Sequence, residues 1–167
     1  TYSYEAGLLK SQTDAMGNTT RYSHNTLGQV ISKTDANNKV TQYEYDGIGN
    51  LLRTTDANGK SIINAYDGNY QKTSVTDANG YTTRYRYNEN MKTVFIVFPN
   101  GEITQYEYDS EDRLVLIQDS MGNSTIFGYD KAGRVVSKNL PDGGIIAYEY
   151  DAVGNMVKET NPKGAVT

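Results

Sequence analysis

The sequence has no cysteine, no tryptophan, one histidine and only three prolines. Without cysteine there can be no disulfide framework and no thiolate chemistry. No stretch approaches the roughly 18 consecutive apolar residues of a membrane-spanning helix. The formal net charge is −4 and the 16 Lys and Arg residues are scattered, whereas nucleic-acid-binding surfaces usually cluster them. These absences argue against a disulfide scaffold, a membrane-spanning helix and a nucleic-acid partner.

Catalytic signatures are also missing. The sequence contains no glycine-rich nucleotide loop, zinc-binding helix motif or nucleophile elbow. Loops such as residues 56–59 are rich in oxygen ligands but lack the dense ligand spacing of calcium-binding loops. The only histidine, His24, lacks a partner motif, so we assign it a packing or surface role. We therefore expect no enzymatic activity, no catalytic residue, no cofactor and no metal.

Tyrosine is abundant, with 15 in the chain, and it recurs at a fixed interval. The motif Thr-Gln-Tyr-Glu-Tyr-Asp stands at residues 41–46 and again at 104–109. His24 stands 21 residues before Tyr45, the second tyrosine of the first motif, and Tyr4 lies one residue away from the position that the same spacing gives. We expect a single array of about eight repeats over residues 1–167, part of a longer protein. The second tyrosine recurs every 21 residues, at Tyr45, Tyr66, Tyr87, Tyr108, Tyr129 and Tyr150.

Each repeat reads as one β-hairpin. Residues 134–138 and 145–150 are short, branched and aromatic-rich, and turn residues separate them at 140–143. This predicts an all-β fold of tandem antiparallel hairpins. About sixteen strands exceed the roughly ten that an open sheet usually holds, so we expect the sheet to spiral into a solenoid, shell or tube.

The first turn of most repeats follows the pattern Asp-x-x-Gly, with Asn38 in place of one glycine. All three prolines occupy its second position, which suits a type I turn closed by a left-handed residue. The aspartate can accept hydrogen bonds from the turn's own amides. The expected turn residues are Asp14, Gly17, Asp35, Asp56, Gly59, Asp77, Gly80, Gly101, Asp119, Gly122, Gly143 and Gly164.

The second strand of each repeat sorts its side chains by parity. Thr104, Tyr106 and Tyr108 share one face, and the opposite face is mixed and looks solvated. Cross-strand aromatic pairs contribute roughly 0.2–1 kcal/mol each, so a stripe of them could hold a single sheet together. The expected stripe comprises Tyr22, Tyr43, Tyr45, Tyr66, Tyr85, Tyr87, Tyr106, Tyr108, Phe127, Tyr129, Tyr148 and Tyr150.

The segments Tyr45–Leu51 and Tyr129–Val135 both read Tyr-Asp-x-x-Gly-(Arg/Asn)-(Leu/Val). This pattern, with the Asp-x-x-Gly turn and the Thr-x-Tyr-x-Tyr-Asp motif, resembles the Rhs/YD-repeat family. That family includes bacterial Rhs and wall-associated polymorphic toxins, shell subunits of toxin complexes, and teneurins. The resemblance implies a spiralling sheet that builds a hollow shell, which in the toxins encloses a C-terminal effector.

The resemblance therefore implies a non-enzymatic scaffold of a secreted bacterial or cell-surface shell that encapsulates or displays a cargo. Its partners would be further repeats of the parent protein or copies of itself, with an enclosed effector or a surface glycan. One alternative is an adhesion or glycan-binding fibre of the same repeats. The aromatic cages of wall-binding repeats usually use tryptophan, which this chain lacks. We therefore expect these tyrosines to pack within the sheet. Another alternative is a toxin whose enzymatic domain lies beyond the repeats.

The fifth repeat departs from the pattern. Its first strand is apolar on both faces, and a phenylalanine replaces the turn aspartate. Such a strand requires cover on both faces, so another part of the parent or a partner is expected to pack there; the alternative is an internal plug or local self-packing. The expected contact patch is Val94, Phe95, Ile96, Val97 and Phe98.

Overall fold

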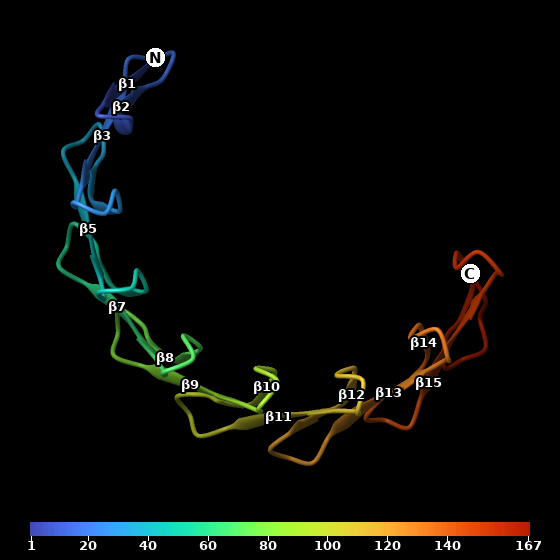
Figure 1. Cartoon of the computed structure of the whole chain (residues 1–167). Helices are drawn as coiled ribbons and strands as arrows, with labels where there is room; N and C mark the ends of the chain where they lie inside the picture. The colour runs from blue at the N-terminus through green and yellow to red at the C-terminus, as the bar shows by residue number, and fades with distance from the viewer. The chain divides into compact units, whose positions relative to one another are not determined.

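The computed structural model describes residues 1–167 and consists of strands and turns only. Sixteen strands follow one another in the sheet in sequence order, and the paired neighbours run antiparallel (Figure 1). This confirms the prediction of tandem antiparallel hairpins, and no helix is present that could cross a membrane. The strands are β1 (Tyr2–Glu5), β2 (Leu8–Thr13), β3 (Thr19–His24), β4 (Val30–Thr34), β5 (Val40–Tyr45), β6 (Leu51–Thr55), β7 (Ser61–Tyr66), β8 (Lys72–Thr76), β9 (Thr82–Tyr87), β10 (Thr93–Val97), β11 (Ile103–Tyr108), β12 (Leu114–Asp119), β13 (Ser124–Tyr129), β14 (Val135–Asn139), β15 (Ile145–Tyr150) and β16 (Met156–Thr160).

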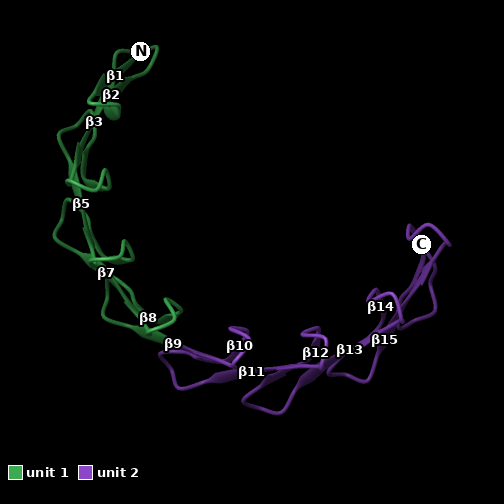
Figure 2. Cartoon of the chain, in the orientation of Figure 1, with its two compact units in different colours: residues 1–83 green, residues 84–167 purple.

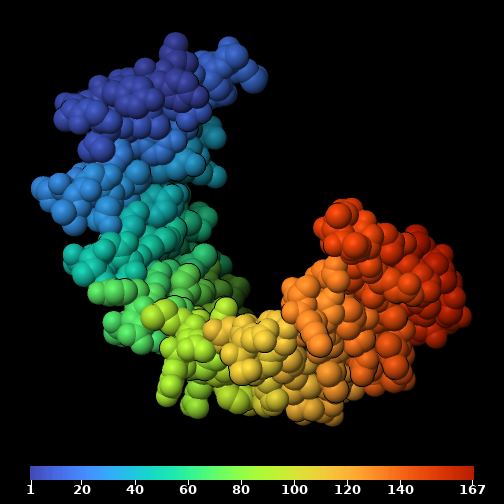
Figure 3. Space-filling model, turned by 45° about the vertical axis from the view of Figure 1, so that its right-hand side comes forward, coloured from blue at the N-terminus to red at the C-terminus, as the bar shows by residue number.

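The chain divides into two compact units, unit 1 (residues 1–83) and unit 2 (residues 84–167) (Figure 2). Unit 1 holds β1 to β8 and the start of β9, and unit 2 holds the rest of β9 and β10 to β16. Within each unit, consecutive hairpins lie side by side as successive bands (Figure 3). Both units are therefore built from the same repeated element.

The turns repeat one hydrogen-bond frame. At Asp119, the backbone N–H donates to the Asn123 carbonyl (3.0 Å), and the Gly122 N–H donates to the Asp119 carbonyl (3.1 Å). Gly122 has φ of 86°, the left-handed conformation that lets a three-residue turn follow the twist of the strands. Four residues with side chains also adopt positive φ in the equivalent position of other turns, at a cost of roughly 1–2 kcal/mol each: Asn38, Tyr70, Met91 and Asp112.

The first hairpin turns differently. Ala6 and Gly7 form a two-residue turn, with φ of 49° and 80°, between the paired residues Glu5 and Leu8. Positive φ at both central residues is typical of the tight hairpin turns that match strand twist. This shorter turn explains why Tyr4 lies one residue out of phase with the other repeats.

Counted from the N-terminus, the hairpins are β1–β2, β3–β4 and so on to β15–β16, and each carries a β-bulge beside the position where tyrosine recurs. Glu107 pairs with Leu116 and Tyr108 with Leu114, so Val115 is an extra residue on β12. The register shifts in the same place in the other repeats, for example at Tyr129 and at Tyr150. A bulge leaves backbone groups outside the regular ladder, which then need another partner.

The sheet has no hydrophobic core. No hydrophobic residue is buried, and the only buried residue is Asn64, which is 8% exposed. The accessible surface is 11219 Å², whereas a compact globule of this mass would expose about 8,200 Å². Each unit is a single layer whose two faces both reach solvent, so its stability must come from the strand ladders and from contacts between side chains of neighbouring strands.

Candidate functional site

The recurring tyrosine ends the second strand of the repeat in sequence, which is the first strand of a hairpin counted from β1, and it is bonded to the preceding hairpin. The Tyr129 hydroxyl donates to the backbone carbonyl of Leu114 at 2.7 Å, and Leu114 is the residue opposite Tyr108 at the bulge. The hydroxyl therefore supplies a partner where the ladder is interrupted. We call this contact the tyrosine–bulge bond. It recurs from Tyr45 to Val30 (2.9 Å), Tyr66 to Leu51 (3.1 Å), Tyr108 to Thr93 (3.0 Å) and Tyr150 to Val135 (2.8 Å).

An arginine adds a second connection between neighbouring hairpins. The Arg113 guanidinium pairs with Asp109 (Nη2–Oδ2, 2.6 Å) and lies 4.9 Å from the centroid of the Tyr129 ring. The hydrogen bond from the Arg113 side chain, together with its backbone N–H and its charge, lowers the pKa of Asp109. Arg134 repeats the arrangement between Asp130 (2.7 Å) and Tyr150 (4.7 Å). The cation thus holds its own turn and also covers the tyrosine of the next hairpin.

Asparagine performs half of this role. In the turn that begins at Asp46, the Asn50 amide donates to the Asp46 carboxylate at 2.9 Å. Asn155 makes the same bond to Asp151, also at 2.9 Å. The shorter side chain holds the turn without covering the next tyrosine. The geometry therefore gives a physical reason why both arginine and asparagine occur at this position of the motif.

All twelve residues of the expected aromatic stripe are half-buried. Tyr43 pairs across the strands with Thr54, and Tyr106 pairs with Ile117. The sequence analysis missed Asn64, although it stands 21 residues after Tyr43 and takes its place in the array. Its amide donates to the Leu51 carbonyl at 2.8 Å, the same acceptor that Tyr66 uses.

The expected turn aspartates accept hydrogen bonds from the turn's own amides. Asp14 accepts from the Met16 and Asn18 backbone N–H groups (2.8 and 2.9 Å) and from the Asn18 amide (2.9 Å). These donors, the Asn18 side chain foremost, lower the pKa of Asp14. Similar backbone bonds hold the carboxylates of Asp35, Asp56, Asp77 and Asp119, and the turn glycines with positive φ are Gly17, Gly59, Gly80, Gly101, Gly122, Gly143 and Gly164.

The expected contact patch separates onto two faces. Ile96 pairs with Tyr85 and Thr104 on the tyrosine face, whereas Phe95 and Val97 lie on the opposite face. Val94 is the extra residue of the bulge, and Phe98 begins the next turn, where it is 39% exposed. A cavity of about 230 Å³ opens on the face opposite the tyrosines, lined by Arg86, Phe95, Val97 and Ile103.

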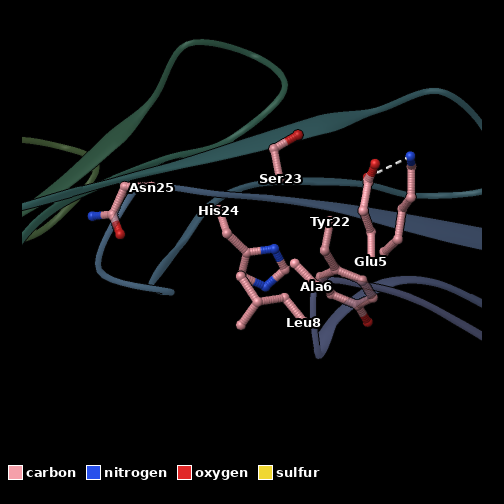
Figure 4. Close-up of a pocket in the computed structure, with 8 residues that line it drawn as sticks. Glu5, Ala6, Leu8, Tyr22, Ser23, His24 and Asn25 are labelled. Atoms are coloured by element: carbon pink, nitrogen blue, oxygen red, sulfur yellow. Dashed lines mark hydrogen bonds and ion pairs between the residues drawn. The ribbon is translucent and has the colours of Figure 1, made fainter.

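A second cavity, of about 360 Å³, lies beside the first hairpin, where Tyr22, His24 and Leu8 point toward one another (Figure 4). Glu5 and Lys10 form an exposed ion pair of 2.6 Å at its edge. The His24 imidazole makes no hydrogen bond within the chain, and no cluster of three metal-ligating side chains is present in the structure. The cavity forms where a histidine replaces the tyrosine that would otherwise reach back toward the preceding hairpin.

The repeat pattern also matches a known family in sequence. The profile of the family described as RHS Repeat matches residues 2–30, 24–61 and 129–166, which together are more than half of the chain. This chain belongs to the RHS repeat family. The family resemblance predicted from the tyrosine, aspartate and glycine spacing is therefore confirmed. None of the curated proteins is significantly similar to this RHS repeat chain in sequence.

Solved structures share its fold. The crystal structure of TcdB2-TccC3-TEV matches with a TM-score of 0.76 and 22% identity, over 92% of this chain and 10% of that chain. The crystal structure of TcdB2-TccC3-Cdc42 matches with a TM-score of 0.73 and 21% identity, over 86% of this chain and 9% of that chain. The Tc holotoxin pore of Photorhabdus luminescens matches with a TM-score of 0.72 and 20% identity, over 89% of this chain and 9% of that chain. The RHS repeat chain therefore spans about a tenth of the length of these proteins.

Proposed function

We propose that this chain is a non-enzymatic wall segment of a secreted or cell-surface RHS-repeat shell that encloses or displays a cargo, such as a toxin effector. The observation that supports this most directly is the single-layer sheet without a buried hydrophobic side chain. A sheet of this kind has two accessible faces, which suits a wall that separates an interior from an exterior. The tyrosine–bulge bonds give such a wall cohesion from one hairpin to the next.

The solved structures with this fold support the proposal. Two are titled TcdB2-TccC3 complexes and a third is a Tc holotoxin pore, and in each the matching region is about a tenth of a much longer chain. A repeat segment of this length would then contribute part of a larger enclosure. Its direct partners would be further repeats of the parent protein, and an effector would lie inside.

The alternative of a glycan-binding fibre is less well supported by the tyrosine geometry. Sugars stack on open aromatic faces, but the rings of Tyr129 and Tyr150 are covered by the guanidinium groups of Arg113 and Arg134. The hydroxyls of both tyrosines already donate to backbone carbonyls. Both observations favour a packing role for these two side chains.

Cryo-electron microscopy of the full-length parent protein tests the proposal. We expect closed hollow particles whose wall is one sheet thick, with density for a cargo inside. Solid filaments with a packed cross-section would contradict the shell and leave the surface fibre as the better explanation. A parent truncated after the repeats serves as the control, because it should keep the wall and lose the internal density.

A further inference from the structure

The repeats of this chain provide an internal reference for the face opposite the tyrosines. Three of the strand pairs that an Asp-x-x-Gly turn connects carry, next to that turn, two hydroxyl side chains joined by a hydrogen bond. The position equivalent to Phe95 is serine in four other repeats: Ser11, Ser32, Ser74 and Ser137. The bridged pairs are Thr13 with Thr19 (2.9 Å), Thr55 with Ser61 (2.9 Å) and Thr76 with Thr82 (2.8 Å).

The β10–β11 strand pair has hydrocarbon side chains in place of these hydroxyls. Val97 pairs with Ile103 where three other strand pairs have the hydroxyl pair, and Phe95 stands where four other repeats have serine. Ile103 is 41% exposed. The position of Ile103 is also apolar in some other copies, as Val40 and Ile145, but only here are all three neighbouring positions apolar on a face that reaches solvent. Exposed apolar surface that is concentrated in this way often marks a protein–protein contact.

Two arginines border this apolar surface on β9. Arg86 pairs with Phe95 and Arg84 with Val97, so both lie on the same face. Neither forms an ion pair within the chain. Three other arginines of the chain do have carboxylate partners: Arg53 pairs with Glu44, Arg113 with Asp109, and Arg134 with Asp130.

Glu107 is the only carboxylate of β11, and it accepts a hydrogen bond from the Gln105 amide (2.8 Å). The two guanidinium groups on β9 thus remain available to carboxylates of another molecule, next to an apolar cavity. We call Arg84, Arg86, Phe95, Val97 and Ile103 together the β10 surface. All five residues belong to unit 2.

We propose that the β10 surface is a docking site for a polypeptide segment that carries an apolar side chain flanked by carboxylates. The cavity of about 230 Å³ is smaller than the roughly 300–1,000 Å³ of drug-sized ligand sites, which suits a single anchoring side chain. Arg84 and Arg86 would receive the carboxylates, because guanidinium groups bind them in a planar, bidentate geometry. This surface function is independent of whether the parent protein closes into a shell.

Two-dimensional NMR of the isotope-labelled 167-residue chain tests the site. The probes are end-blocked pentapeptides of sequence Gly-Asp-Phe-Asp-Gly and Gly-Lys-Phe-Lys-Gly, titrated separately. With a single anchor, weak binding in the millimolar range is expected for the acidic peptide. Its shift changes should centre on the backbone amides of β9, β10 and β11, and the lysine peptide should bind at least about tenfold more weakly.

Variants that restore the common repeat residue keep the test independent of misfolding. Phe95→Ser introduces the serine of four other repeats, and Val97→Thr with Ile103→Thr recreates the hydroxyl pair. Each should lower the affinity for the acidic peptide by about tenfold or more, with the circular dichroism spectrum and thermal midpoint retained. The matched control is Ile63→Thr, which removes an exposed apolar side chain from the same face of unit 1 and should leave binding unchanged.

Equal binding of the two peptides would overturn the proposal, as would unchanged binding by Phe95→Ser. Sedimentation at increasing protein concentration distinguishes a further occupant. If the wild-type chain self-associates and the Phe95→Ser variant does not, the surface is an interface between copies of this chain, and the proposed acidic segment is wrong.

Discussion

The Tyr129 hydroxyl and the Leu114 carbonyl, 15 residues apart in sequence, form a 2.7 Å hydrogen bond between neighbouring hairpins. Leu114 stands opposite Tyr108, whose own hydroxyl reaches back to Thr93. The hairpin of β11 and β12 therefore receives one such bond and donates another. In repeat proteins, stability is approximately the sum of repeat and nearest-neighbour terms. The tyrosine–bulge bond is a nearest-neighbour term that can be removed one atom at a time.

Tyr129→Phe should lower the free energy of unfolding by about 1 kcal/mol, because the ring stays in place while the Leu114 carbonyl loses its donor. Urea unfolding followed by circular dichroism measures the change. The control is Tyr106→Phe, whose hydroxyl makes no hydrogen bond within the chain and whose removal should change stability by less than about 0.5 kcal/mol. Equal effects of the two variants would contradict the role of the bond.

Substitutions of Arg134 should separate its two contacts. Arg134→Asn preserves a donor to the turn, as Asn50 does toward Asp46, but loses the stacking on Tyr150. Arg134→Ala loses both. We expect Arg134→Asn to lower the free energy of unfolding by about 0.5 kcal/mol and Arg134→Ala by about 1 kcal/mol, because partly exposed cation–π contacts and ion pairs each contribute little. If Asn and Ala are equally destabilising in urea unfolding, the asparagine substitution does not support the turn.

His24→Tyr should stabilise the first hairpins. The carbonyl that lies 15 residues before position 24 belongs to Leu9, and Leu9 pairs with Tyr4 at a bulge as in the other repeats. A tyrosine hydroxyl that reached it would add roughly 0.5–1.5 kcal/mol. Slower amide hydrogen exchange in β1 to β3 is the expected result, and His24→Phe is the control without the hydroxyl. Equal protection by Tyr and Phe would show that the added ring, and no new bond, is responsible.

Acid should weaken the turns. The Asn123 side chain and turn amides lower the pKa of Asp119 below its ordinary value of 3.8. A carboxyl with a lowered folded-state pKa contributes stability that is present above the ordinary value and is lost as the pH falls through the folded-state value. Thermal midpoints should therefore decrease as the pH drops below about 4.

Asp119→Asn tests this assignment, because Asn161 accepts turn N–H bonds in the equivalent place without a charge. The variant should lose less stability on acidification than the wild type, and an identical acid dependence would exclude Asp119 as a contributor.

Alkali should act on the tyrosines. Burial, together with the neighbouring Tyr106, raises the pKa of Tyr108 above its ordinary value of 10.0. A phenol with a raised folded-state pKa contributes stability that is complete below the ordinary value and is lost as the pH rises through the folded-state value. Loss of strand signal in circular dichroism should therefore accompany phenolate absorbance above about pH 10. Phenolate formation with no change in the strand signal would contradict a structural role for these hydroxyls.

Much of the fold was predictable because it repeats. Where one copy has an atypical residue, the same position in the other copies shows the usual one. Strand order, hairpin turns and the tyrosine face could therefore be predicted without the structure. The phase offset of Tyr4 and the replacement of tyrosine by His24 were visible in the same way. The left-handed Tyr70, Met91 and Asp112 could not be predicted, because the hydrogen-bond frame of the turn overrides their local preference.

The sequence by itself determined the unit, its period and which side chains share a face, since these follow from the alternation of a strand and the chemistry of Asp, Gly and Pro in turns. Only the tertiary structure decided what the tyrosines bond to. A bulge shifts the register by one residue, and that shift brings the Leu114 carbonyl within reach of the Tyr129 hydroxyl. The tertiary structure also decided which side chains of the apolar strand β10 lie on each face, because its pairing with β9 and β11 determines which of them point to solvent.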